Sequence, residues 1–114
     1  MIGATKLLGQ AQLGVALTTI YTAPSQPPGT KGMVQTMWIC NSDIVARAVT
    51  IRVGTGALTS ANGLLEATPI AANTTYVVGD AQGFGFVLDA GALVQGLCDV
   101  ASKVTVSLFG QEVL

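Results

Sequence analysis

The sequence contains no histidine. The commonest general base of enzymes is therefore missing, and Ser/His/Asp and Cys/His catalytic arrangements are excluded. Most of the acidic residues fall at predicted turns or strand ends, where carboxylates usually serve solvation and turn hydrogen bonds rather than paired acid–base catalysis. We therefore expect a protein that is not an enzyme and has no catalytic residues.

Charge is also scarce, because only 10% of the 114 residues are charged, with five basic and six acidic side chains. A typical soluble domain carries about a quarter. No basic stripe is present for a nucleic acid, and no run of about 20 apolar residues is present to span a membrane. With so little charge and half of the residues apolar, we expect part of the surface to be covered by copies of the chain or by other proteins.

The chain has only two cysteines, Cys40 and Cys98, and both lie in apolar strand patterns. This placement favours small buried hydrophobic residues, although a single disulfide remains an alternative. Two thiols without histidine do not make a zinc site. The stretches "GTG" (54–56) and "GFG" (83–85) lack the strand–loop–helix context of a phosphate site. We expect no metal and no cofactor.

Glycines and short polar clusters divide the sequence into β-branched and aromatic runs, without sustained helical periodicity. This pattern predicts an all-β chain that forms one antiparallel β-sandwich, jelly-roll-like, of about eight or nine strands. The strands are expected near residues 5–13, 16–22, 32–41, 46–54, 64–70, 74–78, 83–88, 93–100 and 103–109. Prolines exclude a central strand from Thr22 to Gly32.

One domain is expected, in which residues 1–22 form an N-terminal arm with the first strands and residues 23–114 form the body of the sandwich. The arm could be exchanged with a neighbouring molecule, since an extended segment can add a strand to an open sheet edge.

The run "MVQTMWIC" (33–40) is apolar on both faces of its predicted strand. Strict alternation places Val34, Thr36, Trp38 and Cys40 on one side and the intervening residues on the other. "FGFVL" (84–88) is apolar on both sides as well. We expect these strands to form a subunit interface, and an alternative is that the chain's own N-terminal arm covers the first of them. The interface candidates are Met33, Gln35, Met37, Trp38, Ile39, Phe84 and Phe86.

Several segments resemble a group of small tailed-bacteriophage virion proteins along nearly the whole chain. These segments are "LGQAQLGVALTTIYTAP", "MWICNSD", "ARAVTIRVG", "PIAANTTYVV" and "FVLDAGALVQGLCDVASKVTVSLFGQEVL". The matching steps are Thr18 to Pro24, Cys40 with Asn41, and Leu88 to Leu93. In the last step Ala92 stands in place of the usual Asp.

The resemblance implies a structural component of a phage particle, most simply a capsid decoration (cement) protein or a head or tail accessory protein. Its partners would be itself, as a homotrimer or higher oligomer, and other virion proteins such as the major capsid protein. It would be located in the virion, after assembly in the host cytoplasm. The alternative is a phage tail or host-recognition module that binds a carbohydrate.

Overall fold

The computed structural model describes residues 6–78 and 86–113. Within these residues, nine β-strands and one short 3-10 helix form the regular structure. The strands are Lys6–Gln12 (β1), Thr18–Thr22 (β2), Lys31–Asn41 (β3), Arg47–Gly54 (β4), Gly63–Ile70 (β5), Thr74–Val78 (β6), Phe86–Leu88 (β7), Leu93–Cys98 (β8) and Val104–Val113 (β9), and the helix is Ser60–Asn62 (η1). Each of these strands overlaps a strand predicted from the sequence. The last one continues to Val113 rather than ending at Phe109.

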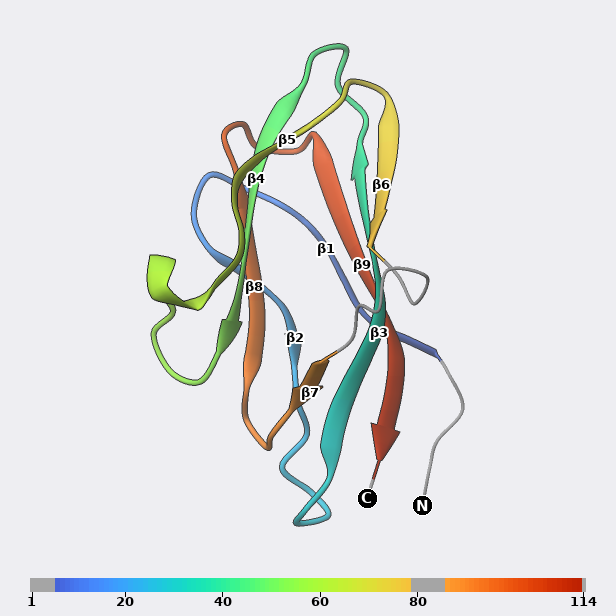
Figure 1. The fold of residues 1–114 in the computed structure, drawn as a ribbon, viewed down its shortest axis with the longest axis vertical. Coiled ribbons are helices and arrows are strands. Elements are labelled where there is room, and N and C mark those ends of the chain that lie inside the picture. The colour runs from blue at the N-terminus through green and yellow to red at the C-terminus, as the bar shows by residue number, and fades with distance from the viewer. Residues whose placement is uncertain (1–5, 79–85, 114) are drawn as a thin grey trace.

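The strands form two antiparallel sheets that pack face to face (Figure 1). The five-stranded sheet has the order β1-β9-β3-β6, and β7 also pairs with β3. The four-stranded sheet has the order β2-β8-β4-β5. The all-β sandwich expected from the sequence is confirmed.

The hydrophobic core lies between the two sheets. Val104, Val106 and Leu108 of β9 are fully buried, as are Val49 and Ile51 of β4. These are the inward residues that alternation predicts for the two strands. Two sheets that each turn one face toward the other bury alternate residues of every strand, and this packing holds the sandwich together.

Strand β3 does not alternate strictly, because its pairing with β9 shifts register between Val34 and Thr36. This β-bulge places Val34 on the same inner side as Met37 and Ile39, which are both fully buried. Val34 and Met33 therefore lie on the opposite sides from those that strict alternation predicts. The expectation that Met37 and Ile39 form a subunit interface is wrong for this fold, because both side chains fill the core.

The described part of the N-terminal segment extends the five-stranded sheet at its edge. β1 pairs with β9 of the same chain, from Lys6 opposite Gly110 to Gln12 opposite Thr105. It therefore lies beside β9 in the sheet and does not cover the outer side of β3. Trp38, near the middle of β3, is 48% exposed.

Candidate interaction surface

The side of the five-stranded sheet that faces away from the core, hereafter the outer face, carries several large apolar side chains. The register identifies them, since residues directly opposite each other in antiparallel strands point to the same side. Phe109 follows the inward Leu108 and lies opposite Thr36 and Leu7. The apolar residues of the outer face are Leu7, Met33, Trp38, Val77, Val87 and Phe109.

Trp38 and Phe109 are in direct ring contact on this face. Their ring centroids are 5.3 Å apart, with an interplanar angle of 56°. A tilted aromatic pair at this separation is favourable beyond the area that it buries. Because Phe109 supports the indole from one side, Trp38 holds a defined position while almost half of its surface stays open to solvent.

The other side chains of the outer face near Trp38 are uncharged. Ser107 lies opposite Trp38 and accepts a hydrogen bond of 2.8 Å from the amide of Gln10. Thr75 and Thr105 flank the exposed Cys40. Among the residues that the structure describes, the part of this face around Trp38 therefore combines a central aromatic pair with amide, hydroxyl and aliphatic groups, and the charged Lys31 lies apart from it at the end of β3.

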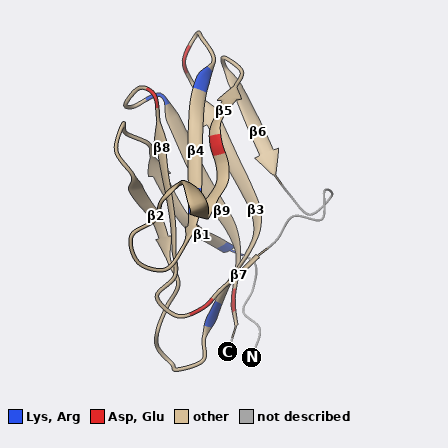
Figure 2. Ribbon diagram, turned by 60° about the vertical axis from the view of Figure 1, so that its left-hand side comes forward, with Lys and Arg blue, Asp and Glu red and all other residues tan. Residues whose placement is uncertain are grey.

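The described charged residues lie mostly toward the two ends of the sandwich (Figure 2). Every Asp and Glu among residues 6–78 and 86–113 takes part in an ion pair. The pairs are Lys6–Glu112, Lys31–Asp89, Arg47–Asp43, Arg47–Asp99 and Arg52–Glu66. Because these charges neutralise one another locally, few are left to solvate the strand surfaces between the two ends.

The interface candidates named from the sequence fall into several groups. Met33 is partly buried and lies with Trp38 on the outer face, whereas Gln35 is partly buried at the bulge. Phe86 lies opposite the inward Val34 and packs against the core. Phe84 lies outside the described residues.

The structure adds Leu7, Val77, Val87 and Phe109 to the candidate surface. No sequence signal identifies them as neighbours of Trp38, because only the strand pairing places them there. The cysteine expectation is confirmed for Cys98, which is buried, and is wrong for Cys40, which is exposed on the outer face. Both thiols are free.

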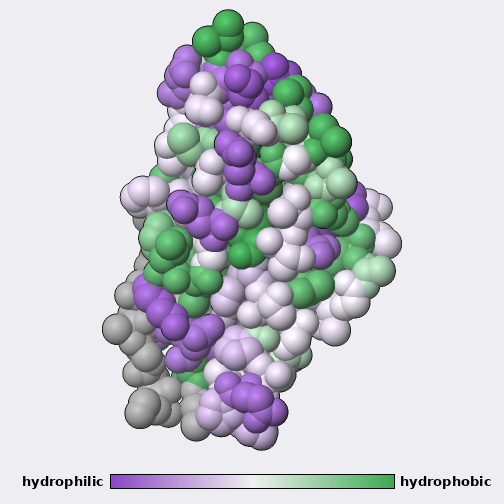
Figure 3. Space-filling model, turned by 180° about the vertical axis from the view of Figure 1, so that it is seen from behind, coloured by the Kyte–Doolittle hydropathy of each residue, from purple (hydrophilic) through white to green (hydrophobic). Residues whose placement is uncertain are grey.

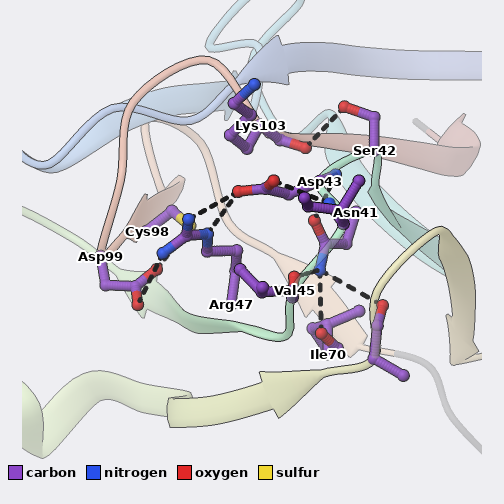
Figure 4. Close-up of polar contacts among 11 residues, drawn as sticks. Asn41, Ser42, Asp43, Val45, Arg47, Ile70, Cys98, Asp99 and Lys103 are labelled. Carbon is purple, nitrogen blue, oxygen red and sulfur yellow. Dashed lines mark hydrogen bonds and ion pairs between the residues drawn. The ribbon is translucent and has the colours of Figure 1, made fainter.

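A second feature is the loop that follows β3, which a polar network braces (Figure 4). Asn41 is fully buried, and its amide nitrogen donates to the backbone oxygens of Val45, Ile70 and Ala71 at 3.0–3.2 Å. Its amide oxygen accepts from the backbone N–H of Asp43 at 2.9 Å. One side chain thus ties this loop to the end of β5.

Asp43 and Arg47 complete this network. The Asp43 carboxylate accepts from the backbone N–H of Ile44 at 2.7 Å and from Nε of Arg47 at 2.7 Å. The bond from Arg47 is the main reason that the pKa of Asp43 lies below its ordinary value. Arg47 also reaches Asp99 at 3.8 Å. Asn and Asp side chains often form hydrogen bonds to backbone groups near them in a loop. The segment "CNSD" (40–43), with Asn41 and Asp43 at the end of a predicted strand, is therefore the sequence pattern that could have indicated this loop.

The braced loop presents apolar residues at its tip. Ile44 is 82% exposed and Val45 is 46% exposed. The loop forms the upper end of the molecule in Figure 1, and the same end is coloured hydrophobic in the view from behind (Figure 3). The sequence interpretation did not single out these two residues.

An open pocket of about 340 Å³ lies near the other end of β4. Val53 of β4 and Phe86 of β7 contribute to it, and the other residues come from η1 and the start of β5. The lining residues are Val53, Ala61, Asn62, Gly63, Leu64 and Phe86. None of them is charged.

At the opposite end of the sandwich from the braced loop, Glu112 joins the two sheets. Its carboxylate accepts from Lys6 of β1 at 2.9 Å and from the hydroxyl of Tyr21 of β2 at 2.8 Å. These bonds lower the pKa of Glu112. Burial, together with the bond to Glu112, raises the pKa of Tyr21 well above its ordinary value. This contact links β1 and β9 of one sheet to β2 of the other.

Within the described residues, no helix has the length and apolar character that crossing a bilayer requires, and no group of three or more Cys, Asp or Glu side chains is placed to hold a metal ion. A comparison of the chain with family models, with curated proteins and with solved structures finds no match.

Proposed function

We propose that this chain is a structural component of a bacteriophage virion, and that it acts as a capsid decoration (cement) protein. The outer face of its five-stranded sheet would contact neighbouring subunits. The observation that carries this proposal is the half-exposed Trp38, which is surrounded on the outer face by uncharged side chains. Such a face is poorly matched to water and well matched to another protein surface.

The path of the chain agrees with this proposal. If β6 and β7 count as one position, because both pair with β3, each sheet has four positions, and most connections cross from one sheet to the other. We infer from this wrapping that the sandwich is a jelly roll, an architecture that recurs in viral capsid proteins and in lectins. The sequence segments that resemble phage virion proteins support the same interpretation.

The mechanism would be adhesion. A standard contact buries about 800 Å² on each partner, and apolar burial stabilises by about 25 cal/mol per Å², although association entropy offsets much of this gain. Repeated identical contacts over a shell add avidity. A closed trimer would cover the outer face of each copy through rotational symmetry. The proposed location is therefore the virion, and the proposed partners are other copies and the major capsid protein.

The oligomeric state tests this proposal. Trp38 is the only tryptophan in the chain, so its fluorescence reports directly whether the outer face is covered. We expect light scattering at micromolar concentration to give a trimer or a larger species, and we expect tryptophan emission at shorter wavelength than in the dilute protein. Trp38→Ser should reduce the mass to that of one chain.

Tyr76→Ser is the matched control. The exposed fraction of Tyr76 is 44%, which is similar to that of Trp38. Tyr76 lies opposite Ile39, however, and therefore on the inner side of the sheet. The control should keep the mass of the unaltered protein. The proposed contact would be refuted if the unaltered protein stayed monomeric at micromolar concentration and its emission were that of a solvent-exposed tryptophan.

A second candidate function is carbohydrate binding in a phage tail or host-recognition module. The observation that favours it is the same indole, which lies open beside the hydroxyl of Ser107 and the amide of Gln10. Aromatic faces with neutral hydrogen-bonding groups suit an uncharged sugar. Binding to cell-wall polysaccharide on a glycan array, lost in Trp38→Ser, would favour this function, whereas binding to capsid shells would favour the first.

A further inference from the structure

The connection between β4 and β5 contains the only Asn-Gly pair of the chain, Asn62 and Gly63. The side-chain amide of an Asn residue can react with the backbone nitrogen of the residue that follows it, which makes Asn thermolabile. Glycine hinders this attack least because it has no Cβ atom. Gly63 is exposed and Asn62 is only partly buried, so water reaches both residues. The pair therefore has the residue types and the access that spontaneous deamidation requires.

The reaction needs only water as a co-reactant. The backbone nitrogen of Gly63 loses its proton and bonds to Cγ of Asn62, the Cγ–Nδ2 bond breaks, and ammonia leaves with that proton. Water then opens the succinimide ring that has formed. Opening at Cγ gives aspartate, whereas opening at the backbone carbonyl carbon gives isoaspartate, in which the main chain runs through the former side chain. Nothing is oxidised or reduced, and either product carries one new carboxylate.

Hydrogen bonds at η1 occupy both reacting groups in the folded chain. The N–H of Gly63 donates to the backbone oxygen of Ser60, and Oδ1 of Asn62 accepts from the backbone N–H of Thr59 at 3.0 Å. The Asn62 side chain is therefore held toward the beginning of the helix and not toward the nitrogen of Gly63. Both hydrogen bonds must open before the ring can form. Since η1 has three residues and buries none of them, this opening is local and requires no separation of the sheets.

The other two Asn residues of the chain lack this combination. Asn41 precedes Ser42, but it is fully buried and its amide nitrogen makes three hydrogen bonds. Asn73 is exposed, but it precedes Thr74, whose branched side chain hinders the approach of the backbone nitrogen. Deamidation of the folded chain should therefore be confined to Asn62.

We propose that Asn62–Gly63 is a site of spontaneous deamidation, and that the opening of η1 sets its rate. Aspartate at position 62 keeps an oxygen that accepts from Thr59. Isoaspartate inserts a carbon atom into the main chain between η1 and β5, so the hydrogen bond from Gly63 to Ser60 is lost. Each conversion adds one negative charge to a chain whose formal net charge is −1. The inference concerns neither the outer face nor the oligomeric state, so it does not depend on the proposed function.

Incubation of the full chain in mildly alkaline buffer tests this proposal, with one sample folded and a second sample unfolded in urea. Peptide mapping by mass spectrometry measures the conversion of each Asn, and enzymatic methylation measures isoaspartate. In the folded sample we expect product at Asn62 and none at Asn41 or Asn73. In urea the rate at Asn62 should be about tenfold higher, because the two hydrogen bonds no longer oppose ring formation.

Three results of this incubation overturn the inference. The first is the absence of product at Asn62 in the folded sample over a period in which the unfolded sample converts completely. The second is faster conversion of Asn73 than of Asn62 in the folded sample. The third is an equal rate at Asn62 in the two samples.

A pair of Thr variants tests the role of η1. Thr59→Ala removes the hydroxyl that accepts from the N–H of Ala61 at 3.3 Å. It should raise the rate at Asn62 in the folded sample about threefold, and it should leave the rate in urea unchanged. Thr55→Ala is the matched control, because Thr55 is exposed in the same connection but lies outside η1. Equal rates in the two folded variants overturn the inference.

Gly63→Ala tests the attacking nitrogen. The atoms nearest to a Cβ at this position are side-chain atoms of Glu66, which can move, so the fold should tolerate the change. The added Cβ hinders ring closure, and we expect the rate at Asn62 to fall about tenfold in both samples. An unchanged rate would mean that water hydrolyses the Asn62 amide directly, and this result overturns the proposed reaction of the pair.

Discussion

The side-chain amide of Asn41 donates a hydrogen bond of 3.0 Å to the backbone oxygen of Ile70, which joins the end of β3 in one sheet to the end of β5 in the other. Asn41 also serves the loop that carries Ile44, so one buried side chain links the sheet packing to the shape of the tip. The first prediction concerns this residue.

We expect Asn41→Ala to lower the free energy of unfolding by about 2–3 kcal/mol, because buried carbonyl and N–H groups lose their partner. Ser42→Ala is the control. The Ser42 hydroxyl is exposed, and its backbone N–H donates to the same oxygen of Lys103, so the loss should be about 0.5 kcal/mol or less. Urea unfolding measures both values, and equal losses would contradict the central role of Asn41.

The second prediction concerns Gly110 in β9. A Cβ atom at this position would lie only 1.9 Å from the backbone oxygen of Met33, next to the bulge of β3. Gly110→Ala must therefore move the backbone of one strand, and we expect a loss of about 1–3 kcal/mol in the free energy of unfolding. Gly14→Ala is the matched substitution, since a Cβ there meets no atom within 4 Å. Thermal unfolding should separate the two variants by several degrees.

The third prediction concerns acid stability. The pKa of Glu112 is lowered in the folded chain by Lys6 and Tyr21, so its contribution is fully present above the unfolded pKa of about 4.3. It is lost as the pH falls from that value through the lower folded pKa. Asp43, Glu66 and Asp89 shift in the same direction. We expect unfolding midpoints in urea to be level near neutral pH and to fall below about pH 4.5.

Glu112→Gln isolates one part of this acid limb. The amide does not titrate, so the midpoint should be lower than that of the unaltered protein at pH 7 and should fall less steeply between pH 5 and pH 3. Parallel curves for the two proteins would show that Glu112 makes no contribution to acid unfolding.

Burial and Glu112 raise the pKa of Tyr21, so Tyr21→Phe should flatten the alkaline limb above about pH 10.

The fourth prediction concerns the two thiols. Cys40 is exposed on the outer face, whereas Cys98 is buried and burial raises the pKa of its thiol. A maleimide should modify one thiol per chain in native protein and the second only after unfolding. If neighbouring copies cover the outer face, the rate at Cys40 should fall as protein concentration rises. A rate independent of concentration over the range where the mass increases would place the contact elsewhere.

The all-β class and the positions of the strands follow from the sequence, because turn residues and β-branched runs act locally. The inward positions of Val104, Val106 and Leu108 follow for the same reason, since β9 keeps its period of two over this stretch. Strict alternation groups Val34 with Trp38 and Met33 with Met37, and both groupings are wrong because a bulge depends on how two strands pair, which the alternation of one strand does not contain.

What the sequence by itself determined is the chemistry available: no histidine, few charges, and more apolar side chains than one small core conceals. Only the tertiary structure decided where the excess lies, because long-range pairing brings Leu7, Trp38 and Phe109 from three distant strands to one face. It likewise decided that Met37 and Ile39 fill the core and that the loop after β3 holds Ile44 in solvent. These placements depend on register and on hydrogen bonds between residues far apart in the chain, which composition and periodicity do not encode.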